Sequence, residues 1–138
     1  MKLCIIILLC IAAFSAVADS TFVCGSVSGV WDTAGSPYCV VCDVHVPTGD
    51  TLRTMPGVKV VFMANFGFYV DSMAVLKAIG TVGDSIIFTT SGPSVFHKAI
   101  NFTKSAPGCT LAYCRVEKGS NGGIRCSNSS PVIINNKI

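Results

Sequence analysis

Short stretches of alternating apolar and polar residues recur along the chain, and turns rich in Gly, Pro, Ser and Asn separate them. Together they form a strand–turn–strand motif that occurs four times after an apolar N-terminal segment. Copies of the motif begin at Asp43, Gly67, Ala99 and Gly123. Matching positions recur after roughly 22 to 35 residues, which is within or just short of the repeat spacing of solenoid proteins. The pattern therefore predicts short strands that stack on one another.

Within each copy, apolar residues share one side of a strand by the period of two that strands impose. The first such set is Val40, Cys42, Val44 and Val46, within a predicted strand at 38–46. Each coil is predicted to run short strand, turn, short strand, turn, short strand. The four predicted coils cover 38–62, 66–88, 99–117 and 123–138.

Two folds accommodate strands of this length, an antiparallel sandwich and a parallel β-helix. The predicted turns lack the Asn-Gly and Asp-Gly pairs that favour tight hairpins. The repeat also has a constant internal order, which a β-helix requires because each coil pairs with the coils above and below it. We therefore predict an all-β fold, a right-handed parallel β-helix of about three to four coils with an N-terminal cap segment.

The N-terminal region differs from the repeats. Residues 1–18 are predicted to be a signal peptide, because Lys2 precedes an apolar run too short to span a bilayer comfortably and 16–18 are small residues. An uncleaved membrane anchor is the alternative. Residues 19–37 are predicted to form the N-terminal cap segment. Residues 38–138 are predicted to form the β-helix repeats, which we expect to be truncated at the C-terminus.

Charge changes this picture little. The chain has a formal net charge of +3, and its charged residues are scattered singly. Without a basic stripe, nothing predicts binding to nucleic acid. No second apolar stretch of spanning length follows the leader, so we expect a secreted or cell-surface protein with no membrane span in the mature chain.

Six of the eight cysteines remain once the leader is removed. Cys39 and Cys42 have the spacing of a zinc or redox pair. A strand places them on opposite sides, however, and export favours disulfides over thiolate–metal sites. We therefore predict no metal site and no cofactor, and a disulfide between Cys24 and Cys39 that contributes roughly 3 kcal/mol by tying down the cap. Cys114 and Cys126 are expected to point inward, although the sequence alone does not determine the pairing.

Five stretches of the mature chain match a familiar pattern, namely 46–52, 55–60, 76–81, 84–89 and 122–131. They resemble the N-terminal part of bacterial secreted proteins with right-handed parallel β-helix repeats, of the pectin-lyase-like superfamily. The resemblance implies the fold and says little about activity. Proteins of this kind are usually larger, so the chain resembles a truncated member or an N-terminal fragment. Some members of the superfamily cleave acidic polysaccharides.

Residues suited to catalysis are not clustered in the sequence. Polysaccharide lyases need grouped carboxylates for calcium and a basic residue, and hydrolases need two or three converging carboxylates. The acidic residues here sit singly, mostly at turns where Asp caps local backbone. His45 is expected to face solvent from a strand, and His97 to lie in a projecting loop beside Lys98. Both patterns are more typical of surface residues than of a base or a ligand, so we predict no catalytic residue.

These observations favour a non-catalytic secreted or cell-surface scaffold that binds a polysaccharide or a surface protein. The alternative is a carbohydrate-active enzyme, either a polysaccharide lyase or a glycoside hydrolase, or a fragment of one. The outward strand faces and the loops 90–97 and 118–122 would form the contact surface. The apolar last coil also predicts self-association through the C-terminal coil. The residues expected nearest to a ligand are Tyr69, Phe96, His97 and Tyr113.

Overall fold

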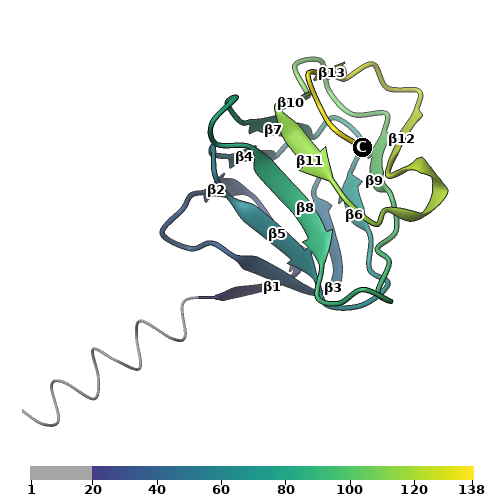
Figure 1. The fold of residues 1–138 in the computed structure, drawn as a ribbon. Coiled ribbons are helices and arrows are strands. Elements are labelled where there is room, and N and C mark those ends of the chain that lie inside the picture. Colours follow the sequence, from purple (N-terminus) through teal and green to yellow (C-terminus); the bar gives the residue numbers. More distant parts are fainter. Residues whose placement is uncertain (1–19) are drawn as a thin grey trace, which may run out of the picture.

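The protein folds as a parallel β-solenoid of about four turns with almost no helix (Figure 1). The computed structural model describes residues 20–138, so the predicted signal peptide at 1–18 lies outside the described residues. Every strand pairing is parallel, which excludes the antiparallel sandwich. Within 20–138, no helix is long and apolar enough to cross a membrane.

Thirteen strands and one 3₁₀ turn make up the stack. They are β1 (Thr21–Ser26), β2 (Gly29–Trp31), β3 (Tyr38–Val46), β4 (Thr51–Thr54), β5 (Lys59–Phe62), β6 (Phe68–Val70), β7 (Val75–Ile79), β8 (Ile86–Thr90), β9 (Ile100–Thr103), β10 (Thr110–Ala112), β11 (Cys114–Val116), η1 (Ser120–Gly122), β12 (Ile124–Ser127) and β13 (Val132–Ile134).

The strands form three faces. On the first face, the second half of β3 is followed by β6, β9 and β12, one strand per turn. The second face has the order β2, β4, β7, β10 and β13. On the third face, the first half of β3 is followed by β5, β8 and β11. β3 belongs to two faces because the chain bends between Val40 and Val44.

Equivalent apolar residues lie above one another inside the stack. Val44, Phe68, Ile100 and Ile124 form one such row on the first face. Across the interior, the rings of Phe68 and Phe88 meet edge to face with centroids 6.0 Å apart, a favoured aromatic geometry. The alternation seen in the sequence thus becomes a single core, because each inward row is covered by the turns on either side.

The segment predicted as a cap forms the first turn of the solenoid as regular strands. β1 and β2 pair in parallel with β3 and β4. Trp31, the largest apolar side chain of this segment, is 5% exposed and stacks on Tyr38 with ring centroids 4.6 Å apart. Residues 21–31 therefore extend the solenoid by one turn rather than covering it with irregular backbone.

The predicted disulfide was wrong in one partner. Cys24 bonds to Cys42, with their Cα atoms 5.0 Å apart, and Cys39 is a buried free thiol. The prediction treated 38–46 as a straight strand, which would put Cys42 inside. The bend between Val40 and Val44 instead carries Cys42 to the corner of the turn, beside the corresponding corner of β1 that holds Cys24.

We predict that removing this disulfide destabilises the first turn. The double substitution Cys24→Ser and Cys42→Ser should lower the free energy of unfolding by about 3 kcal/mol, because the bond closes a loop of 18 residues in the unfolded chain. Urea unfolding without reductant measures the change. The matched variant Cys39→Ser should keep the disulfide, as detected by peptide mapping. A Cys24–Cys39 peptide in the unmodified protein would contradict the assignment.

Candidate functional site

The outward side of the first face carries a row of polar and aromatic side chains, one from each turn. The row is His45, Tyr69, Asn101 and Arg125, which are direct partners in neighbouring parallel strands. We call these four residues the polar ladder. Adjacent strands are about 4.8 Å apart, so the ladder extends roughly 14 Å along the solenoid axis. Residues 80 positions apart in sequence therefore form one continuous surface.

The ladder begins with an aromatic stack. The rings of His45 and Tyr69 lie nearly parallel, with centroids 4.8 Å apart and planes inclined by 17°. Nδ1 of His45 lies 3.1 Å from Oδ1 of Asp71, which follows β6 directly. Both side chains of this pair are partly exposed, at 43% and 38%. The carboxylate orients the imidazole, and the stack fixes its plane.

Local backbone geometry positions the Tyr69 ring. Gly67 lies beneath the ring, and a Cβ atom at this position would come within 2.5 Å of Cε2 of Tyr69. The backbone N–H of Gly67 also donates to Oδ1 of Asp43 at 2.8 Å, which ties the start of β6 to the preceding turn. A glycine is therefore required here, because any side chain at position 67 would collide with the Tyr69 ring.

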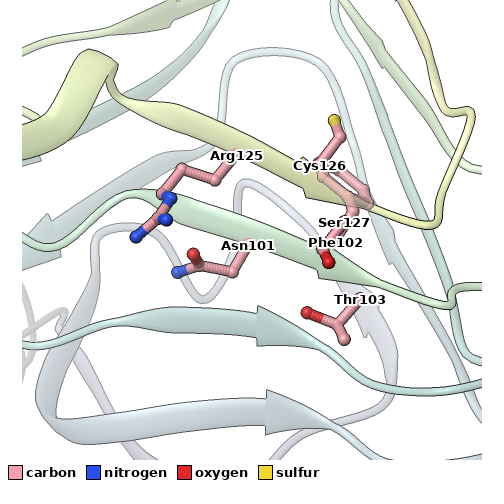
Figure 2. Close-up of a pocket in the computed structure, with 6 residues that line it drawn as sticks. All are labelled: Asn101, Phe102, Thr103, Arg125, Cys126 and Ser127. Carbon is pink, nitrogen blue, oxygen red and sulfur yellow. The ribbon is translucent and has the colours of Figure 1, made fainter.

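The other end of the ladder borders a shallow depression of about 370 Å³. Figure 2 shows the side chains of Asn101 and Arg125 on the same side of β9 and β12, with Thr103 further along β9. Arg125 is exposed, and no carboxylate lies within ion-pair distance of it among the described residues. The lining residues are Asn101, Phe102, Thr103, Arg125, Cys126 and Ser127.

No protein family, curated protein or solved structure matches this chain. The fold agrees with the one that the resemblance implied, a parallel β-helix. Within residues 20–138, no three His, Cys, Asp or Glu side chains come together as they would around a metal ion. The case for a site consequently depends on the ladder itself.

The structure does not bring the four predicted binding residues together. Tyr69 lies in the ladder. Phe96 is 52% exposed at the corner between the third and first faces, where its carbonyl accepts a hydrogen bond from Asn65 Nδ2 at 2.8 Å. Tyr113 is half-buried in the tight connection between β10 and β11, with a φ of 52°. Of the four, only Tyr69 lies on the outward side of the first face.

The expected placement of His97 in an exposed loop was wrong. Its side chain is fully buried and stacks on Phe62, with ring centroids 4.4 Å apart. Its backbone N–H donates to the Lys118 carbonyl, and the Ser120 N–H donates to the His97 carbonyl. The loops 90–97 and 118–122 therefore bond to each other, and His97 is enclosed at their junction instead of being presented to a ligand.

Asn101 and Arg125 were missed by the sequence reasoning. Each sits between two apolar residues of a repeat copy, in the position that His45 and Tyr69 occupy in the earlier copies. Aligning the four copies against each other would have identified the row. The prediction instead selected aromatic residues one at a time, which found Tyr69 without its neighbours.

Burial makes His97 a source of pH-dependent stability. Desolvation lowers the pKa of His97 below its ordinary value of 6.5, and contacts of its ring with the carbonyls of Lys98 and Glu117 oppose that shift. In the unfolded chain the ring has its ordinary pKa, so the unfolded state binds the extra proton first. The contribution of the neutral, buried His97 to the free energy of unfolding is therefore fully present above pH 6.5. It is lost as the pH falls toward the pKa of His97 in the folded protein.

We predict that the unfolding free energy falls by at most about 1.4 kcal/mol per pH unit in this window. Urea unfolding at about pH 7.5 and pH 5.5 measures this dependence. The substitution His97→Gln should flatten this dependence, because it removes the buried group that titrates. If wild type and His97→Gln show equal pH slopes, burial of this imidazole does not govern the effect.

Proposed function

We propose that this chain is a secreted or cell-surface scaffold of the pectin-lyase-like type, without catalytic activity, that binds an extended glycan along the polar ladder. The observation that carries the proposal is the register of His45, Tyr69, Asn101 and Arg125 on one outward face. A chain of sugar rings offers repeated hydroxyl groups, and the ladder offers a hydrogen-bonding group from each successive turn.

The chemistry of the ladder suits a carbohydrate better than an apolar ligand. Tyr69 supplies an aromatic body with a polar tip, which can contact a sugar ring while remaining hydrated. The amide of Asn101 and the hydroxyls of Thr103 and Ser127 can each donate and accept. The guanidinium of Arg125 adds a planar set of donors. Sites of this kind use a few fixed polar groups to set ligand orientation.

One observation favours the enzymatic alternative, a polysaccharide lyase or glycoside hydrolase. The contact between His45 and Asp71 orients the imidazole, and its Nε2 has no hydrogen-bond partner among residues 20–138. A histidine held in this way can act as a general base. Hydrolysis with paired carboxylates would need a second acid beside Asp71.

We predict that Tyr69→Ala and Arg125→Ala each weaken binding to a soluble polysaccharide by roughly tenfold or more, as expected for central aromatic and Arg contacts. Affinity electrophoresis and calorimetry with neutral and acidic polysaccharides measure the loss. The matched controls Tyr113→Ala and Arg53→Ala remove the same side chains from other parts of the solenoid and should bind as wild type does. Equal losses in the ladder variants and the controls would rule out the ladder as the binding surface.

The same samples distinguish a scaffold from an enzyme. Incubation with polygalacturonate is followed by absorbance of unsaturated product and by release of reducing ends. The scaffold proposal expects no turnover above a heat-denatured sample. Turnover that is lost in His45→Ala but kept in His97→Gln would instead assign catalysis to the pair formed by His45 and Asp71.

A further inference from the structure

The first and last turns of the solenoid both expose apolar side chains. Phe22 and Val30 on the first turn are 67% and 59% exposed. Ile134 and Ile138 on the last turn are 50% and 64% exposed. In Figure 1 these turns lie at opposite ends of the stack. We propose that copies of this chain associate head to tail, with the first turn of one copy lying on the last turn of the next.

The backbone of the last turn has an edge ready for another strand. The N–H of Val132 donates to Cys109 at 2.9 Å, and the carbonyl of Ile134 accepts from Tyr113 at 3.4 Å, so both residues bond toward β10. Alternate residues of a parallel strand direct their backbone N–H and C=O groups to opposite sides. The N–H and C=O of Ile133 therefore face away from β10. No strand within 20–138 pairs with that side of β13. An edge of this kind is a template for strand addition.

Side chains on the second face match across such a junction. One outward row runs Val30, Arg53, Lys77, Thr110 and Val132 in direct register. Its interior members are polar, and both of its end members are valines. If the register continued from copy to copy, Val132 would lie beside Val30 of the next copy. The two apolar ends of the row would then cover each other.

Charge favours head-to-tail over tail-to-tail contact. The segment 118–138 carries Lys118, Arg125 and Lys137 and no Asp or Glu. Two last turns placed together would bring like charges close, which costs free energy in a contact that excludes water. The first turn, residues 21–31, carries no charged side chain. It can therefore approach the positive last turn without repulsion.

This contact joins two different surfaces, so it does not close on itself and produces linear oligomers. It also continues the polar ladder across the junction. Ser26 precedes His45 in the same outward row. Arg125 of one copy would thus lie beside Ser26 of the next copy. The inference does not depend on glycan binding, because it rests on the end turns and their register.

Sedimentation velocity over a range of concentrations measures the mass of the chain without the predicted signal peptide, residues 19–138. Wild type should form species that grow with concentration beyond a dimer. A tail variant, Val132→Lys with Ile133→Lys, and a head variant, Phe22→Lys with Val30→Lys, should each be monomeric. Val82→Lys places a lysine on an 87% exposed turn away from both ends, matches the single substitutions Val30→Lys and Val132→Lys in charge, and should assemble as wild type does. Circular dichroism and cooperative unfolding confirm that each variant is folded.

Mixing the variants gives the decisive result. The head variant retains a free last turn and the tail variant retains a free first turn, so an equimolar mixture should form dimers and nothing larger. Dimerisation of the head variant alone would show tail-to-tail contact and overturn the proposal. A wild-type monomer at every concentration would overturn it as well. If a doubled variant unfolds, the single substitutions Val30→Lys and Val132→Lys provide the same comparison.

Discussion

A turn of this chain can bury its apolar side chains only by lying on another turn, because its strands, mostly three to five residues long, enclose no core by themselves. Parallel register is therefore the constraint on which the rest of the structure depends. It places equivalent residues of successive turns in direct contact, both inside and outside the stack. Inside, the result is a row such as Val44, Phe68 and Ile100. Outside, the same register aligns the polar ladder.

The polar ladder shows how stacked strands align side chains from distant parts of the sequence on one surface. Its spacing is set by backbone hydrogen bonds between turns, at about 4.8 Å per strand, and not by loop conformation. Its members are held by local contacts, such as the Asp71 carboxylate beside His45 and the glycine under Tyr69. Because loops are usually the mobile parts of a protein, a site on strands gains precision from the fold itself.

The sequence was sufficient to predict the stacked fold, because a period of two inside a longer repeat has few other structural solutions. It failed where local geometry departs from that period. The bend in β3 moved Cys42 to a corner, so the disulfide partner of Cys24 was missed. Two loops closed over His97 through backbone hydrogen bonds, which no side-chain pattern reveals. The ladder was missed because register between turns was not used, although the repeat copies contain it.

The two ends of the stack are stabilised by different means. A disulfide joins the first turn to the second at Cys24. The last turn adds side-chain hydrogen bonds to its strand pairing, with Asn136 accepting from the Cys114 N–H at 2.8 Å and donating to the Leu111 carbonyl at 2.6 Å. Ser129 accepts from the Ser105 N–H at 2.8 Å. Polar contacts of this kind compete with water, and a neighbouring turn stacked in register would exclude that water.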